Sequence, residues 1–411
     1  MSTKVVDPML GDSRIRFPSP LSLRLRIGRR YVPTWVILLV GYGLSRILTT
    51  GLLAGAWALA STQGWTIAHF DGNPGFLGYL QSWDGPYYRQ VALHGYPTSL
   101  PADSAGNVEK NAWAFLPLYP MIVRAIMAVT GLDFAVAGVL VALVFGAAAT
   151  FALHRLLLQR FGSTTALWGA LFFCFGPMSF VLEVTYAESV FLFFMFCALA
   201  AMMSRRYLVM IPFGVAAAFA HPGALALAAA LGIHGLVRLL RREPFPVRSI
   251  VSAVTAVVVI AAAGLAWPLI ASAVTGDPSG YFKSELSWWS DYLGRVHFFP
   301  FTPWFLFAGH YWGLVGILLV IAVLAGFVWW MTRRSVRALG TDLLAYTGSY
   351  VAYLVAVFLP QQSLFRMLLP LSPLLGHPTL SRTPTRRGVT LAVSILLQPV
   401  GILLFWVIWP P

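Results

Sequence analysis

Long apolar runs constrain this chain more than any other feature of its sequence. Residues 249–273 and 304–331, for example, contain no Asp, Glu, Lys or Arg. An α-helix needs about 20 apolar residues to cross the hydrocarbon core of a bilayer, where backbone polar groups must be satisfied within the protein. Only 10% of the residues are charged, whereas a soluble domain carries about 25%. The sequence therefore predicts an all-α polytopic membrane protein.

The net charge of +14 would favour nucleic-acid binding if the chain were soluble. Here the basic residues stand at the ends of apolar runs, as the positive-inside bias requires, so no nucleic-acid partner is expected. Residues 1–32 are rich in Arg and lack the apolar core of a signal peptide, so they are predicted to be a cytoplasmic N-terminal segment. Arginine greatly outnumbers lysine, which favours a GC-rich bacterial genome and hence the bacterial plasma membrane.

The rest of the chain, residues 33–408, is interpreted as a single transmembrane domain. Its apolar runs predict about eleven crossings. They lie at residues 33–60, 135–153, 165–181, 187–203, 207–220, 222–238, 249–273, 304–331, 340–358, 363–380 and 388–408.

The apolar residues 113–130 leave two topologies open, because they contain two prolines and an arginine. If they cross the membrane, every later basic cluster lies outside. If they lie in the outer interface or re-enter, each basic cluster falls on the cytoplasmic side, and the prolines are easier to accommodate. We adopt the second arrangement. Residues 61–134 then form a first outer loop with juxtamembrane helices, and residues 274–303 form a second outer loop.

The stretch 82–97 departs most from the apolar pattern, since it combines a carboxylate, an arginine and a histidine with four aromatic rings. Asp84 lies beside Trp83 in this stretch. Partial desolvation near a bilayer raises the pKa of a carboxyl group and makes it a better base. Asp84 is therefore the leading candidate to take the proton from an acceptor hydroxyl whose oxygen attacks a sugar carbon. The alternative is a structural aspartate that caps a helix beginning near Pro86.

Three further candidates are expected on the same outer side. Glu188 begins a span, where a carboxylate is costly unless it is paired or lies in a wet cavity, although it also complements a helix N-terminus. Arg366 lies one turn into a span and is suited to grip a phosphate; the alternatives are a pair with Glu188 or snorkelling to the interface. His221 stands at another outer turn, where a hydrogen-bonded structural histidine is the competing interpretation.

Other polar and aromatic residues have weaker signals. Arg89 is a candidate substrate contact, although a separation of five residues does not place it on one helix face with Asp84. Arg46, within the first span, is expected to bridge to a carboxylate of a neighbouring span. The pair Trp288-Trp289 is interpreted as an interfacial aromatic belt in preference to a sugar platform.

Several nucleotide and metal motifs are absent from the sequence. It has no Asp-x-Asp pair for a metal-bound nucleotide sugar, no P-loop, no Rossmann glycine pattern and no His-Glu-x-x-His. A membrane transferase without a nucleotide site needs a donor dissolved in the bilayer, and a polyprenyl-phosphate sugar is such a donor. Its phosphate leaving group would need a cation such as Arg366. We expect no metal and no separate cofactor.

Four short motifs stand in order along residues 80–375: Trp83-Asp84 with Gly95-Tyr96-Pro97, Phe115 to Pro120, Tyr186-Ala187-Glu188-Ser189, and Phe365-Arg366 with Pro370. The pattern resembles that of the PIG-V mannosyltransferases, which belong to the GT-C membrane glycosyltransferases. The resemblance implies a GT-C fold with a structured first extracytoplasmic loop. It also implies an inverting transfer of mannose from a polyprenyl-phosphate donor, with the acid of the Trp-Asp motif as the base.

The expected acceptor is a membrane lipid or an envelope glycan or glycolipid. Asp84 is predicted to be catalytic, and the predicted substrate contacts are Trp83, Tyr88, Arg89, Tyr186, Glu188, His221 and Arg366. One departure concerns the turn at residues 220–223, where the family often has an arginine and this chain has His221. If that arginine holds the donor phosphate, His221 must replace it or Arg366 must act alone.

Two other functions remain open from the sequence. A secondary transporter or lipid flippase would use charges at the membrane midplane and often has internal repeats, whereas here the charges lie at the outer ends of spans and no repeat is evident. A catalytically inactive scaffold would have Asp84 turned away from any cavity.

Overall fold

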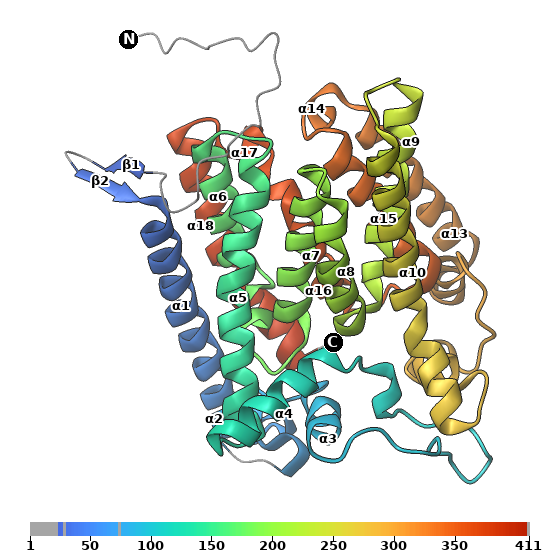
Figure 1. The fold of residues 1–411 in the computed structure, drawn as a ribbon. Helices are drawn as coiled ribbons and strands as arrows, with labels where there is room; N and C mark the ends of the chain where they lie inside the picture. The colour runs from blue at the N-terminus through green and yellow to red at the C-terminus, as the bar shows by residue number, and fades with distance from the viewer. Residues whose placement is uncertain (1–23, 28–29, 73–74, 409–411) are drawn as a thin grey trace.

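The computed structural model describes residues 24–27, 30–72 and 75–408, and it is built mainly from α-helices (Figure 1). A short antiparallel hairpin precedes the first helix, with β1 (Arg24–Ile27) pairing with β2 (Arg30–Pro33). Most of the predicted N-terminal segment 1–32 lies outside the described residues. The predicted all-α membrane fold is confirmed for the rest of the described chain.

Six of the described helical segments are long and apolar enough to cross a membrane. They are α1 (Thr34–Thr62), α5 (Phe134–Leu158), η4 with α9 (Pro222–Ala224 and Leu225–Leu240), α10 (Val247–Thr275), α13 (Pro303–Thr332) and α18 with the π-helical η6 (Pro384–Ile402 and Leu403–Ile408). Shorter apolar helices are α4 (Leu118–Thr130), α6 (Ser163–Cys174), α7 (Glu188–Met203) and α8 (Tyr207–Ala220). A further helix of intermediate length is α15 (Thr341–Val357). The predicted count of about eleven crossings stays a prediction.

The core of the bundle is centred on α5 and α7. α5 packs against α6 and α7, α7 against α8, and α10 against both α8 and α9, while α15 also packs against α9. Apolar side chains such as Met195 and Leu199 of α7 are fully buried between these helices. The outer helices have the opposite pattern, since α13 exposes Leu314, Leu318 and Val328. An apolar outer face of this kind is favourable in lipid and costly in water.

One end of the bundle carries both of the long connecting segments. The first contains η1 (Thr66–Gly72), α2 (Phe76–Tyr79), α3 (Gly85–His94), η2 (Ala112–Ala114) and α4, and the second contains α11 (Gly280–Ser287) and α12 (Ser290–Leu293). Figure 1 shows α2, α3 and α4 together at the lower end, with α5 rising from there. The segment 113–130 therefore stays at this end and does not run through the bundle.

The end of the bundle opposite the long connections carries several of the basic clusters noted in the sequence. Figure 1 shows α14 (Arg334–Arg337) there, near the end of α9, and α17 (Pro378–Ser381) there, near α6. Arg241 donates to Thr341 Oγ1 at 3.1 Å, and the ring of His377 hydrogen-bonds Ser335 O at 2.8 Å. The two ends of the bundle thus differ in charge, with basic side chains collected away from the long connections.

The continuous helix predicted at 363–380 is wrong. The chain there forms three short pieces, α16 (Leu364–Met367), η5 (Leu369–Gly376) and α17. Pro370, Pro373 and Pro378 each remove a backbone N–H and crowd the preceding turn, and three prolines this close together break the regular α-helical ladder. The predicted helix at 165–181 is shorter than expected and ends at Cys174. α13 is also not straight, because Gly313 takes φ +54° and kinks it.

Candidate active site

Asp84 is the residue immediately before α3, but its side chain does not cap that helix. Its Oδ2 instead lies 2.5 Å from Nη1 of Arg366. The carboxylate is 5% exposed, so it is held in a buried ion pair. The capping interpretation of this residue is therefore wrong.

Arg366 joins two carboxylates from distant parts of the chain. The same Nη1 atom that contacts Asp84 lies 3.2 Å from Oε1 of Glu188. Glu188 begins α7 and is 6% exposed, whereas Arg366 comes from the short helix α16. A guanidinium between two buried carboxylates lowers the cost of burying all three charges. The charged residues of the Trp-Asp, Tyr-Ala-Glu-Ser and Phe-Arg motifs thus meet in one cluster.

The cluster forms part of the wall of a cavity of about 420 Å³ at the end of the bundle that carries the long connections. Of the predicted site residues, Asp84, Tyr88, Glu188, His221 and Arg366 line this cavity. Its other walls come from α10, α11 and α15 and are mostly apolar and aromatic. A largely apolar cavity with a few convergent polar groups is typical of a ligand site.

Trp83 holds a strained backbone conformation next to Asp84. Its φ is +70°, in the left-handed region that side chains other than glycine rarely occupy. Such a residue costs about 1–3 kcal/mol and persists only where its surroundings fix it. Here the indole Nε1 of Trp83 donates to Trp406 O at 3.0 Å. Trp83 does not line the cavity; its hydrogen bond ties the residue before Asp84 to the C-terminal helix. The predicted substrate contact of Trp83 stays a prediction.

Tyr186 supports the same turn from the segment before α7. Its hydroxyl donates to Ser82 O and accepts from Asp84 N, both at 3.4 Å. The guanidinium of Arg366 lies over its ring, 4.9 Å from the centroid. Tyr186 is fully buried and does not line the cavity. Tyr186 thus contacts both members of the ion pair. Its predicted substrate contact stays a prediction.

Gly85 allows the segment before α7 to approach the turn that contains Asp84 closely. A Cβ atom at Gly85 would lie 2.8 Å from Thr185 Oγ1 and 3.2 Å from the Cβ of Gln81. The backbone N–H of Thr185 donates to Leu80 O at 3.2 Å. A backbone hydrogen bond therefore joins the segment that contains Asp84 to the segment that leads into Glu188.

Tyr88 and Arg89 are adjacent in sequence but differ in position. The ring of Tyr88 lines the cavity and makes edge-to-face contacts with Phe115 and Tyr119, whose centroids both lie 5.1 Å away. Arg89 points off another face of α3, is partly exposed and does not line the cavity. The structure thus does not support the predicted substrate contact from Arg89.

His221 lines the cavity, and both of its ring nitrogens have partners. Nδ1 accepts a hydrogen bond from Gly223 N at 2.9 Å, and Nε2 lies 3.1 Å from the sulfur of Met367. The ring stacks on Phe191 with centroids 4.5 Å apart. These contacts favour the structural interpretation of His221, which fixes the turn between α8 and α9 next to the Arg366 helix.

Two carboxyl groups of the outer segments have raised pKa values. Burial raises the pKa of Asp84, and the neighbouring Arg366 charge opposes the rise. Burial also raises the pKa of Glu285 to about 7, against a hydrogen bond from Tyr281 and with a further contribution from the charge of Asp84. Carboxyl groups with raised pKa values in a cavity are suited to acid–base chemistry or to polar recognition. Within the described residues, no group of three or more His, Cys, Asp or Glu side chains is arranged to hold a metal ion.

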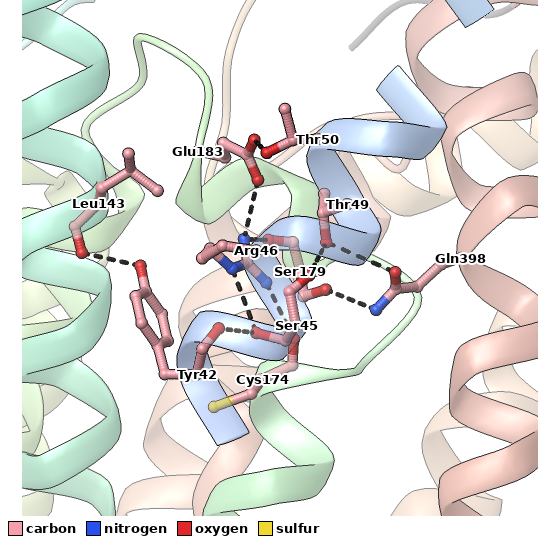
Figure 2. A network of polar contacts seen from close by, with 10 residues as sticks. All are labelled: Tyr42, Ser45, Arg46, Thr49, Thr50, Leu143, Cys174, Ser179, Glu183 and Gln398. Atoms are coloured by element: carbon pink, nitrogen blue, oxygen red, sulfur yellow. Dashed lines mark hydrogen bonds and ion pairs between the residues drawn. The ribbon is translucent and has the colours of Figure 1, made fainter. Parts of the chain in front are cut away.

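A second buried network supports the site from the side of α1 (Figure 2). Arg46 donates through Nη1 to Ser179 O at 2.7 Å and through Nη2 to Cys174 O at 2.9 Å, and its Nη1 lies 3.7 Å from Glu183 Oε2. Gln398 of α18 donates to Ser179 Oγ at 3.0 Å.

The carboxylate expected to pair with Arg46 is therefore Glu183, at the end of η3 (Ser179–Leu182) and not within a span. This network fixes the turn that follows α6. The chain then continues directly to Tyr186 and to Glu188, the first residue of α7. The position of this turn therefore determines the positions of both residues.

Sequence reasoning missed part of the cavity wall. Glu285, Tyr281 and Gln361 line the cavity, and so do both rings of Trp288-Trp289, which had been interpreted as an interfacial belt. The available signal was the spacing of Tyr281 and Glu285, which lie four residues apart and so share a helix face. Nothing in the sequence indicated that the second outer segment folds back over the first.

Comparison with known proteins bears on part of the chain. No model of a known protein family matches it. GPI mannosyltransferase 2 of Drosophila pseudoobscura pseudoobscura is 30% identical over 128 residues. This match confirms the predicted resemblance to the PIG-V mannosyltransferases. The match covers 28% of this chain and 26% of the Drosophila protein, so the activity of the whole chain is a proposal.

Two solved structures are distantly similar. The Archaeoglobus fulgidus oligosaccharyltransferase, crystallised with Zn and sulfate, is 10% identical with a TM-score of 0.44, over 77% of this chain and 48% of its own. ArnT from Cupriavidus metallidurans, bound to undecaprenyl phosphate, is 16% identical with a TM-score of 0.44, over 77% of this chain and 58% of its own. At this level of similarity, nothing about the chemistry of the present chain follows from either structure.

Proposed function

We propose that this protein is an integral membrane glycosyltransferase of the GT-C type that transfers a sugar, mannose, from a polyprenyl-phosphate donor to a lipid or envelope-glycan acceptor. Asp84 acts as the general base. The observation that carries the proposal is the buried cluster of Asp84, Glu188 and Arg366 in the wall of one cavity. The likeness to GPI mannosyltransferase 2 supports mannose as the sugar.

The proposed reaction is a single displacement at the anomeric carbon. The acceptor hydroxyl gives its proton to the Asp84 carboxylate as its oxygen bonds to that carbon. The bond from the carbon to the phosphate oxygen breaks, and the polyprenyl phosphate leaves with the electron pair. Because attack and departure occur on opposite faces, the configuration inverts. Burial raises the pKa of Asp84, which makes it a stronger base than an exposed aspartate.

Arg366 is assigned to the phosphate. Both of its carboxylate contacts use Nη1, and its Nε is buried without a hydrogen-bond partner among the described residues. Arg366 is also the one Arg or Lys among the described residues that line the cavity. In the proposed cycle, the donor phosphate binds the guanidinium and weakens its hold on Asp84, which becomes the stronger base once the donor is in place. Glu188 keeps the guanidinium oriented meanwhile.

A lipid-linked substrate also fits the surroundings of the cavity. An apolar groove of about 560 Å³ lies between α4 and α8 and is lined by Pro117, Met121 and Phe219. Phe115 and Leu116, which precede this groove in the chain, line the cavity itself. We assign the cavity to the extracytoplasmic side. The basic residues of α14 and those that follow α17 belong to the other end of the bundle, and such ends face the cytoplasm.

The donor assignment is tested with purified protein in liposomes made from bacterial membrane lipids. We expect radiolabelled mannose to pass to a lipid or glycan fraction from polyprenyl-phosphate mannose, and not from a nucleotide-linked mannose. The rate should be unchanged by a chelator of divalent metals, since no metal is assigned to the reaction. Transfer only from the nucleotide sugar, or none from the polyprenyl donor, would contradict the proposal.

A further inference from the structure

The cavity has a second set of polar groups that the proposed displacement does not use. Glu285 lines it from α11, in the outer segment that follows α10. Tyr281, one helical turn earlier, donates a hydrogen bond to the Glu285 carboxylate. The charge of Asp84 contributes to the raised pKa of Glu285, so the two carboxyl groups are electrostatically coupled. Glu285 is therefore a fixed polar group in the same cavity as the catalytic candidate.

Two neighbouring side chains have unmatched polar atoms. Within the described part of the chain, Trp288 Nε1 and Gln361 Oε1 are buried and have no hydrogen-bond partner, and both side chains line the cavity. Buried polar atoms in native proteins nearly always have a partner, and leaving one unpaired is costly. One is a donor and the other an acceptor, which together match a hydroxyl-bearing ligand. The ring of Trp288 is held edge-on to Tyr87 and Phe115, with centroids 5.1 and 5.6 Å away.

We propose that Glu285, Trp288 and Gln361 form the subsite that binds the hydroxyl groups of the acceptor sugar. This inference rests on the proposed transferase function. The carboxylate of Glu285 accepts hydrogen bonds from hydroxyl groups, and the rigid indole ring supplies an apolar face for the sugar ring. When Glu285 is ionised, its negative charge repels a phosphate, so the donor phosphate belongs at Arg366 and the hydroxyl-rich acceptor belongs here.

The test measures binding directly and needs no turnover. Full-length protein in lipid nanodiscs is titrated with methyl α-D-mannopyranoside as the sugar probe and with farnesyl phosphate as the phosphate probe, both followed by saturation-transfer NMR. The variants are Glu285→Gln, Glu285→Ala and Trp288→Phe, each checked for folding by thermal unfolding. Glu285→Gln keeps the shape of the side chain, and Trp288→Phe keeps an aromatic ring while removing the indole N–H, so both test the subsite even if the alanine variant fails to fold. Asp277→Asn is the matched control, because Asp277 lies in the same outer segment, pairs with Lys283 and does not line the cavity.

We expect Glu285→Ala to weaken sugar binding by about tenfold or more, which corresponds to 1.4 kcal/mol. Glu285→Gln and Trp288→Phe should weaken it less, while phosphate binding stays unchanged in all variants and Asp277→Asn behaves like the wild type. No sugar binding by the wild-type protein, equal binding by the wild type, Glu285→Gln and Trp288→Phe, or a matching loss of phosphate binding would overturn the subsite. Sugar binding that depends on Glu285, together with no transfer from the polyprenyl donor, would support the subsite while the proposed function fails.

Discussion

The Asp84 carboxylate lies 2.5 Å from the guanidinium of Arg366, although one residue stands near the start of the chain and the other near its end. This contact ties the first outer segment to the helix fragment α16. It also explains how a carboxylate that is 5% exposed stays buried. The ion pair therefore has a structural role, and in the proposed reaction it has a catalytic one.

Removal of Arg366 should destabilise the fold, because Asp84 and Glu188 would become unpaired buried carboxylates. We expect Arg366→Gln to lower the free energy of unfolding by about 3–5 kcal/mol, as measured by SDS titration of the purified protein. Adding Asp84→Asn should restore part of the loss, since one unpaired charge disappears. Lys283→Gln is the control: it breaks an exposed pair with Asp277 and should change little. Equal effects of Arg366→Gln and Lys283→Gln would contradict the account of the cluster.

A methyl group at Gly85 should disturb the Asp84 turn. In Gly85→Ala the new Cβ would meet Thr185 Oγ1 at 2.8 Å, and the buried segment before Tyr186 would have to shift. We expect a lower melting temperature and a loss of transferase activity that exceeds the loss of folded protein. Gly43→Ala is the matched control, because a Cβ there has no neighbour within 4 Å and Ala favours the interior of a helix. If both variants behave like the wild type, the close approach of the two segments is not required.

Most span boundaries could be predicted because they depend on local composition. The boundaries of α1, α5, α8 and α10 fall within a few residues of the expected ones, since apolar length and flanking charges determine them. The break at η5 (Leu369–Gly376) was missed because the apolar signal of the run outweighed its prolines. The contribution of Glu285 could not be predicted, because it depends on how two outer segments fold over each other. Arg89 agrees with its spacing: five residues from Asp84 do not place it on the same helix face, and it does not line the cavity.

The pH dependence of stability should contain a contribution from Glu285. Its pKa rises from an ordinary value of 4.5 in the unfolded chain to about 7 in the folded protein, so between these values the folded state binds more protons. Its contribution to stability is therefore greatest below about pH 4.5 and is lost as the pH rises through about 7. The stability of Glu285→Gln relative to the wild type should increase across this window in denaturant titrations. A difference that stays constant with pH would show that the folded protein does not hold this proton.

The orientation in the membrane can be tested by cysteine labelling of intact cells. Ser104 is exposed in the first outer segment, and Ser163 begins α6 at the opposite end of the bundle. We expect Ser104→Cys to react with a membrane-impermeant maleimide from outside, and Ser163→Cys to react only after the cells are permeabilised. The unmodified chain, with Cys174 and Cys197, is the background control. Labelling of Ser163→Cys from outside would reverse the proposed orientation and move the cavity to the cytoplasmic side.

The most direct test of the central claim is the rate of mannose transfer from polyprenyl-phosphate mannose by the wild type and by Asp84→Asn. The asparagine variant keeps the shape of the side chain, and Arg366 keeps its contact with Glu188, so the protein should remain folded. Because a positioned base contributes about 10²–10⁴-fold to a rate, we predict a loss of at least about a hundredfold. A folded Asp84→Asn protein that transfers mannose at the wild-type rate would contradict the assignment of Asp84 as the base.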